Sequence, residues 1–146
     1  EPMRAQALEV FFERWSREAL VIDQWFAIQS ACPRPGAIAR IETLMNHSAY
    51  SMTNPNRMRS VLAGFAMQNL TAFHQVDGSG YRLLAEKVSM LNGFNPQMAA
   101  RMLGPLTGWR KFSDDHGQAM QAALQSILDE GDLSPDVYEV VTKSLA

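Results

Sequence analysis

The side chains best suited to metal or nucleophilic chemistry are three histidines and one cysteine, and their spacing supports neither reaction. A catalytic zinc site needs two histidines one helical turn apart and a third ligand. His47, His74 and His116 are widely separated, and no His-Glu-x-x-His motif occurs. Cys32 has no nearby histidine or basic cluster to stabilise a thiolate. We therefore expect no catalytic residue and no metal site, and we interpret the histidines as surface or interface residues.

A glycine-containing string could be mistaken for a phosphate-binding loop. Gly78-Ser79-Gly80 is neither preceded by a strand pattern nor followed by Gly-Lys-Ser/Thr. It is therefore interpreted as a turn, with Asp77 and Ser79 as capping residues for a helix that begins near Tyr81.

Aromatic and basic residues alternate in Trp109-Arg110-Lys111-Phe112, a pattern that can stack on nucleic-acid bases. The chain as a whole has a formal net charge of -2, whereas phosphate binding requires a concentrated basic surface. We expect no nucleic-acid partner, and we interpret the string as core packing with cations that extend to solvent.

A polar pair on one predicted helix is a candidate binding site. At 100° per residue, Gln97 and Arg101 fall on the same side of a helix that follows Asn95-Pro96. One interpretation is a solvated surface. The other is an arginine presented to a carboxylate, for which the paired guanidinium donors are suited.

The elements that must position these residues are helices. Apolar residues recur with helical spacing along the chain, and no segment shows sustained strand alternation. We expect about nine or ten short helices. With 47% hydrophobic and 19% charged residues, residues 1–146 are predicted to form a single all-α domain.

Three predicted helix starts have the same form, a capping side chain followed by proline. They are Asn54-Pro55, Asn95-Pro96 and Ser134-Pro135. The capping positions are 41 and 39 residues apart, close to the roughly 40–47 residue period of HEAT and armadillo repeats. The spacing favours stacked short helices in a HEAT/armadillo-like superhelical array, although similar intervals could arise by chance in an all-helical domain.

The sequence contains no signal for a membrane or an oxidising compartment. No apolar run approaches the roughly 18 residues that a membrane helix needs, and a single cysteine cannot form an intrachain disulfide. We expect no membrane partner and a cytoplasmic location.

Several short strings together resemble one family, in its order and spacing. They cover 20–26, 54–57, 72–74, 77–81, 95–97 with Arg101, and 140–146. This set is similar to the C-terminal domain of the bacterial aminopeptidase N (alanyl aminopeptidase) family of zinc gluzincins. The resemblance runs over nearly the whole chain.

The resemblance implies a non-catalytic helical superhelix that closes over a catalytic domain and encloses a substrate chamber. The zinc ligands, the catalytic glutamate and the amine-recognition motif of the family belong to an upstream domain. The fragment is then expected to hold no cofactor and to be inactive, with zinc in the parent enzyme. The resemblance further implies that the positions matching Gln97 and Arg101 face the chamber and can approach the C-terminal side of a bound peptide.

The resemblance also implies partners, namely the upstream catalytic domain of the same polypeptide and peptide substrates. A domain separated from such a contact is expected to expose an apolar patch and to self-associate. The alternative is a free-standing helical-repeat scaffold that binds a partner protein on its concave surface.

Overall fold

Every regular element in the described part of the chain, residues 2–146 of a computed structural model, is a helix. The α-helices are α1 (Pro2–Trp15), α2 (Ala19–Ser30), α3 (Ala37–Met45), α4 (Pro55–Ala63), α5 (Leu70–Phe73), α6 (Ser79–Asn92), α7 (Pro96–Met102), α8 (Gly104–Thr107), α9 (Asp114–Glu130) and α10 (Pro135–Leu145). A π-helical turn, η1 (Gly64–Gln68), follows α4, and a 3-10 turn, η2 (Trp109–Lys111), precedes α9. The all-α prediction is confirmed.

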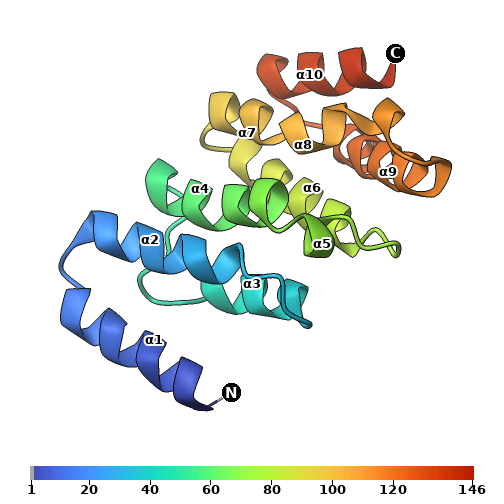
Figure 1. Ribbon diagram of the computed structural model, residues 1–146. Helices are drawn as coiled ribbons and strands as arrows, with labels where there is room; N and C mark the ends of the chain where they lie inside the picture. Colours follow the sequence, from blue (N-terminus) through green and yellow to red (C-terminus); the bar gives the residue numbers. More distant parts are fainter. Residues whose placement is uncertain (1) are drawn as a thin grey trace.

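The helices stack in two rows (Figure 1). In one row α2, α4, α7 and α10 follow one another, and each contacts the next. The other row contains α3, α6 and α9. Helix α1 lies at one end of the stack beside α2, and α10 lies at the other end (Figure 1). Among residues 2–146, every helix falls short of the length and apolarity that a membrane-spanning segment needs.

The three capping side chains all act as predicted. The side chains of Asn54, Asn95 and Ser134 accept hydrogen bonds from the backbone N–H three residues later, at 3.2, 3.2 and 3.3 Å. Each begins a helix of the same row, α4, α7 and α10. The spacing of about 40 residues is therefore a structural repeat. A proline at the first helical position has no N–H that would need a partner there.

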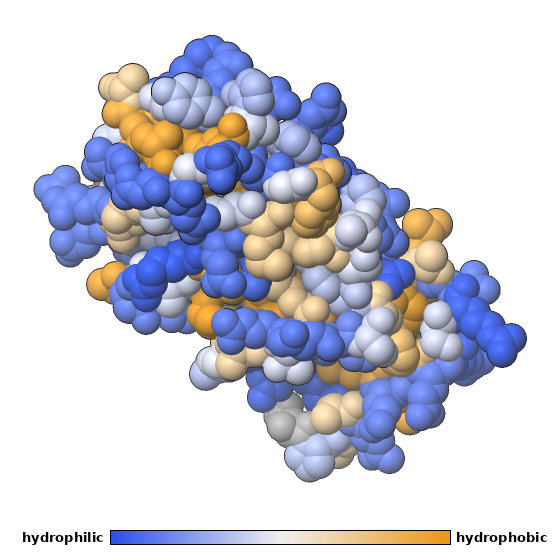
Figure 2. Space-filling model, turned by 180° about the vertical axis from the view of Figure 1, so that it is seen from behind, coloured by the Kyte–Doolittle hydropathy of each residue, from blue (hydrophilic) through white to orange (hydrophobic). Residues whose placement is uncertain are grey.

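The core runs along the seam between the two rows. Its largest fully buried side chains come from α2 to α8: Ile22, Phe26, Ile41, Met58, Leu62, Phe65, Phe73, Tyr81, Leu84, Leu91, Leu103 and Leu106. Together they remove a continuous apolar area from water, which is the main favourable term in folding. The surface seen from behind carries apolar side chains in several patches among hydrophilic residues (Figure 2).

A buried ion pair holds α2 against α4. Arg57 donates from Nε to a carboxylate oxygen of Asp23 at 2.5 Å. The side chain of Arg57 is 10% exposed and that of Asp23 is 14% exposed. The guanidinium also donates to the carbonyl of Ala49 and lies 5.5 Å from the ring centroid of Phe26. A buried arginine needs several acceptors to offset its desolvation, and these partners supply them.

A second buried polar contact closes the loop after α2. Asn69 is 1% exposed, and its Nδ2 donates to the carbonyls of Ser30 and Cys32 at 3.1 and 3.0 Å. Gly64 passes so close to α2 that an added Cβ would lie 3.2 Å from the Ser30 side chain. Residues 32–36, which include two prolines, lie between α2 and α3 and continue neither helix.

Candidate functional site

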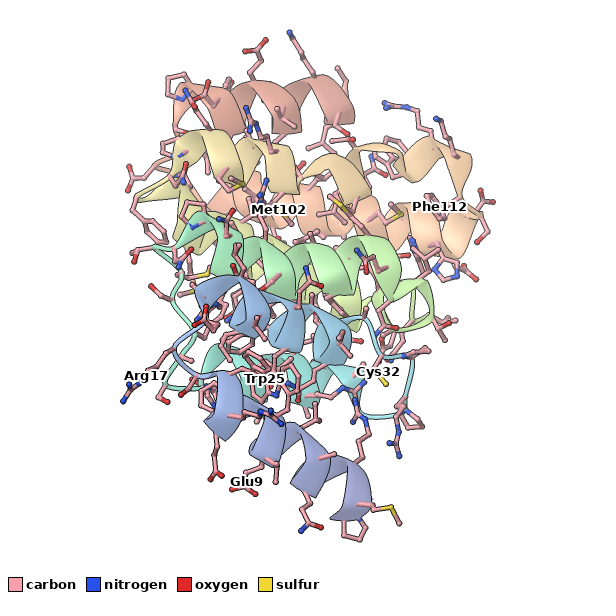
Figure 3. All side chains as sticks on the ribbon, turned by 60° about the vertical axis from the view of Figure 1, so that its left-hand side comes forward. Glu9, Arg17, Trp25, Cys32, Met102 and Phe112 are labelled. Carbon is pink, nitrogen blue, oxygen red and sulfur yellow. The ribbon has the colours of Figure 1, made fainter. Side chains whose placement is uncertain are left out.

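Helix α7 positions the predicted pair Gln97 and Arg101. Its seven residues bury Ala99 and Met102 against the core and leave Gln97 and Arg101 exposed on the opposite side. Met102, which is labelled in Figure 3, is the last residue of α7 and is buried. The periodicity therefore predicted the polar edge correctly. Within residues 2–146, neither polar side chain has a hydrogen-bond or ion-pair partner, so both are available to a ligand.

Gln97 and Arg101 form one side of a shallow, open groove between α7 and α10. The groove has a volume of about 480 Å³, and its other wall contains Asp136, Glu139 and Val140. The sequence did not single out these three residues. A signal existed, because Gln97 and Asp136 each stand two residues after the capping residue of their helix. Helices that occupy equivalent places in neighbouring repeats bring such equivalent positions side by side.

The opposite wall is acidic, but one of its carboxylates is already paired. Lys143 forms an ion pair with Glu139 one helical turn away, and this hydrogen bond and charge lower the pKa of the Glu139 carboxyl. Asp136 lies in the first turn of α10, where a negative charge is favoured by the helix dipole. The guanidinium of Arg101 pairs with neither carboxylate.

Arg101 also borders a second, more apolar hollow on the side of α4. This hollow has a volume of about 340 Å³ and is lined by Arg59, Ala63, Met67, Met98, Arg101 and Met102. Thioether side chains are flexible and polarizable, so a surface built from them adapts to apolar groups of different shape. The arginine therefore stands between a polar groove and an apolar hollow. This combination suits a ligand with a carboxylate beside an apolar side chain.

Helix α10 is anchored at both ends. At its beginning, the Oδ1 of Asn92 accepts from the Ser134 N–H at 2.8 Å, and its Nδ2 donates to the Asp132 carbonyl at 3.0 Å. At its end, Trp109 Nε1 and an Arg110 nitrogen donate to the Ser144 carbonyl at 3.1 and 2.8 Å. Helix α10, which forms the side of the groove opposite Gln97, is therefore held by hydrogen bonds at its beginning and at its end.

The predicted packing role of the 109–112 string is confirmed for its first two residues. Trp109 packs against the core, and the guanidinium of Arg110 lies 4.1 Å from the centre of its ring. Phe112, labelled in Figure 3, is instead 41% exposed. Its ring stacks on that of His74, with the ring centroids 4.7 Å apart.

The histidines, expected as surface or interface residues, lie at the edge of the core and keep part of their surface exposed. The hydroxyl of Tyr81 lies 2.6 Å from Nδ1 of His74 and 3.1 Å from Nδ1 of His116. His47 sits among aromatic rings, 5.2 Å from Trp25, which Figure 3 shows between α1 and α2. All three imidazoles are half-buried and pack on rings, so none is a fully solvated surface residue, and an interface role stays a prediction.

Tyr81, His74 and His116 form a hydrogen-bonded cluster that links the end of α5 to α6 and α9. A phenol has one proton, so its hydroxyl donates to one Nδ1 and accepts from the other. Burial, with a further effect from His116, lowers the pKa of His74, and burial raises the pKa of Tyr81. A neutral His74 suits this arrangement. Among the described residues, no group of three or more His, Cys, Asp or Glu side chains is placed to hold a metal ion.

The turn at 77–80 also differs in detail from the sequence interpretation. Helix α6 begins at Ser79 rather than near Tyr81, so Ser79 is its first residue and not a cap. Asp77 accepts from the Ser79 N–H at 2.9 Å, and this contact lowers the pKa of the Asp77 carboxyl. The hydrogen bond fixes the entry into α6.

The sequence of this helical stack matches a known protein family. The family described as "Domain of unknown function (DUF3458_C) ARM repeats" matches residues 1–146. The chain belongs to this family. Membership in DUF3458_C confirms the armadillo-like array predicted from the spacing of the capping residues.

The relatives of this DUF3458_C chain are much longer than the chain itself. It is 41% identical over 142 residues to aminopeptidase N of Caulobacter vibrioides, and 37% identical over 145 residues to that of Escherichia coli K12. These matches cover 97% and 99% of this chain but 16% and 17% of the relatives. The chain therefore spans about one sixth of their length.

A solved structure has the same fold. The crystal structure of Legionella pneumophila aminopeptidase A in complex with aspartic acid superposes with a TM-score of 0.92 and 31% identity. It covers 97% of this chain and 16% of that chain. The predicted resemblance to the C-terminal domain of bacterial aminopeptidase N is confirmed by these matches.

Proposed function

We propose that this chain is the non-catalytic C-terminal domain of a zinc-dependent aminopeptidase N, in which it caps the catalytic domain and encloses the substrate chamber. The observation that carries the proposal is the unpartnered Arg101 guanidinium, which stands with Gln97 between the polar groove and the apolar hollow. Zinc and the groups that cleave the peptide bond come from the rest of the parent polypeptide, in the cytoplasm.

In this role Arg101 binds the carboxylate of a peptide substrate. A guanidinium presents paired N–H donors that match the two oxygens of a carboxylate. No ion pair within the domain has to be broken first, because Asp136 and Glu139 leave the guanidinium free. Gln97 lies one turn earlier and donates or accepts through its amide. The methionine-lined hollow accommodates an apolar side chain of the same peptide.

The test uses the full-length polypeptide with Gln97→Ala and Arg101→Ala combined. We expect the KM for a free-acid tripeptide to rise about tenfold, because charge-assisted hydrogen bonds contribute roughly 1.5–3 kcal/mol. The kcat for an alanine-linked chromogenic substrate, which has no C-terminal carboxylate for Arg101 to bind, is expected to stay unchanged. A C-terminally amidated tripeptide is expected to bind equally well to both enzymes, since it lacks the carboxylate.

The matched control is Lys111→Ala with Gln118→Ala, which removes an exposed cation and an exposed amide on η2 and α9. This control is expected to leave the KM for the free-acid tripeptide unchanged. Unchanged tripeptide kinetics in the Gln97 and Arg101 double variant would refute the substrate contact. Hydrolysis by the 146-residue chain alone would refute its non-catalytic role.

A further inference from the structure

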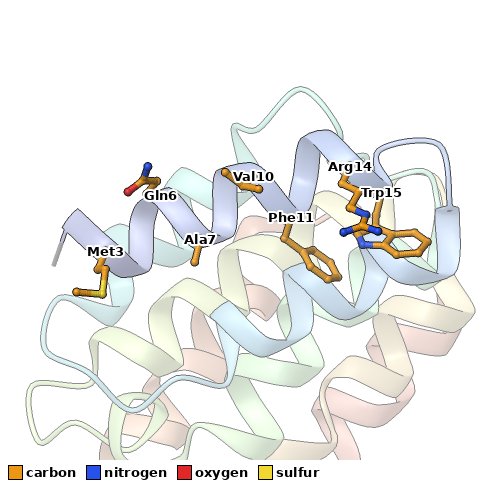
Figure 4. A pocket seen from close by; sticks show the side chains of 7 residues that line it. All are labelled: Met3, Gln6, Ala7, Val10, Phe11, Arg14 and Trp15. Carbon is orange, nitrogen blue, oxygen red and sulfur yellow. The ribbon is translucent and has the colours of Figure 1, made fainter.

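The two ends of the helical stack are held in different ways. Helix α1 packs against the core through Leu8 and Phe12. Another side of this helix, which includes Met3 and Phe11, is exposed to solvent (Figure 4). The beginning of α10 is instead joined to the end of α6 through the side chain of Asn92. This single amide therefore helps to determine where α10 lies beside the groove.

The turn that Asn92 holds, between α9 and α10, has an unfavourable backbone. Gly131 has a φ of 75° and Asp132 a φ of 51°, and Asp132 is the only non-glycine among residues 2–146 in this left-handed region. The Nδ2 of Asn92 donates to the Asp132 carbonyl, while its Oδ1 accepts from the Ser134 N–H. The turn thus depends on a side chain that both donates and accepts, which an amide does and a carboxylate does not.

Asn92 also belongs to the one Asn-Gly pair of the sequence. In such a pair the glycine nitrogen loses its proton and attacks the asparagine Cγ, a C–N bond forms, and Nδ2 leaves as ammonia. Water then opens the resulting succinimide ring to aspartate or isoaspartate. Glycine favours ring closure because it has no Cβ and adopts many backbone conformations. The other five asparagines precede larger residues, two of which are prolines without an N–H.

The closed fold opposes this reaction. Both polar atoms of the Asn92 amide bind the turn between α9 and α10, and the Gly93 N–H donates to the Met90 carbonyl at 3.3 Å. Cγ cannot reach the Gly93 nitrogen until these hydrogen bonds open. Gly93 itself is exposed, and even an added Cβ would meet only the Met90 carbonyl oxygen, at 3.5 Å. Water therefore reaches the reacting bond as soon as the turn opens.

We propose that Asn92 is a deamidation site, protected while α10 is docked and reactive when the beginning of α10 detaches. The product carboxylate still accepts from the Ser134 N–H. It leaves the Asp132 carbonyl without its donor, however, and places a negative charge beside that oxygen. The modification is irreversible, and each molecule that reacts holds α10 less firmly than before.

Peptide mapping by mass spectrometry tests the site. The full-length polypeptide is incubated at mildly alkaline pH, and the deamidated fraction is measured at each asparagine over time. We expect Asn92 to react before the other five. Ser134→Ala removes the capping bond of α10 but keeps the N–H that Asn92 binds. It is expected to raise the rate at Asn92 about fivefold, the factor by which loss of a helix cap shifts an opening equilibrium.

The matched control is Asn54→Ala, which removes the equivalent capping bond of α4. It is expected to leave the rate at Asn92 unchanged, because α4 does not contact the turn that Asn92 holds. An Asn92 that stays intact throughout the incubation would overturn the proposal. Equal rates at Asn92 in the Ser134 and Asn54 variants would overturn it as well, since the reaction would then not follow the opening of α10.

Hydrogen exchange measures the consequence for α10 separately. Asn92→Asp reproduces one product, and in the full-length polypeptide the amides of α10 are expected to exchange about fivefold faster. Asn46→Asp is the control, because Asn46 also follows or ends a helix and its Nδ2 donates to the Glu42 carbonyl at 3.0 Å, within α3. Both variants place a carboxylate at a helix C-terminus, so the effect of the helix dipole is shared. Unchanged exchange of α10 in Asn92→Asp would contradict the loosening.

Discussion

Replacing Gly80 by alanine should destabilise the fold more than its place in a helix suggests. Gly80 is the second residue of α6, where alanine ordinarily stabilises a helix by up to about 1 kcal/mol. A Cβ at this position would lie 2.3 Å from the carbonyl oxygen of Phe73 and 2.8 Å from two further backbone atoms of that residue. The approach is about 1 Å closer than ordinary van der Waals contact.

The size of the effect follows from what would have to move. Backbone atoms cannot rotate away as the end of a side chain can, so α5 and α6 must separate. Phe73 and Tyr81 are fully buried with ring centroids 5.1 Å apart, and separation would loosen this contact. Overpacking a core costs about 1–3 kcal/mol, and we expect Gly80→Ala to fall at the upper end. For a chain of this length the corresponding decrease in Tm is roughly 6–12 °C.

The assay is thermal unfolding followed by circular dichroism, with Gly104→Ala as the matched control. Gly104 is the first residue of α8, and an added Cβ there meets no atom within 4 Å. The control is expected to be neutral or to raise Tm slightly, because alanine restricts the unfolded chain. Equal Tm values for the two variants would show that the close approach of Gly80 to Phe73 does not determine stability.

Two further predictions concern buried polar groups. Asp23→Asn should lower the free energy of unfolding by about 2 kcal/mol in urea titrations, because it leaves the Arg57 guanidinium without its anion; an unchanged midpoint would refute this. Burial lowers the pKa of both His47 and His74, so the unfolded chain binds protons first as the pH falls below about 6.5. Stability should therefore decline from pH 7.5 to 5.5, and less steeply in a His74→Gln variant; an identical slope in that variant would count against the assignment.

The sequence predicted the helical stack because local signals specify it. A capping side chain and a following proline act on the backbone within one turn, so the starts at Asn54, Asn95 and Ser134 could be found without a structure. Their spacing then predicted the repeat. The polar edge of Gln97 and Arg101 also depends only on helical periodicity within α7.

Contacts between distant segments could not be predicted in this way. Tyr81 and His116 are 35 residues apart, and only the packing of α6 on α9 brings the hydroxyl to the imidazole. Single-sequence periodicity likewise could not tell which apolar residues of α1 face the core, because Leu8 and Phe11 both fit a helical stripe. Asp136 likewise lies 39 residues after Gln97, and only the stacking of α10 on α7 brings the two side chains to one groove.

The anchoring of α10 at both ends affects how a ligand would bind in the neighbouring groove. Because Asn92 holds its beginning and Trp109 and Arg110 hold its end, the width of the groove is set before a ligand arrives. Little conformational entropy is then lost in ordering this wall upon binding. Ligands that differ in fit should accordingly differ in residence time rather than in association rate, since a preformed site presents the same target to each of them.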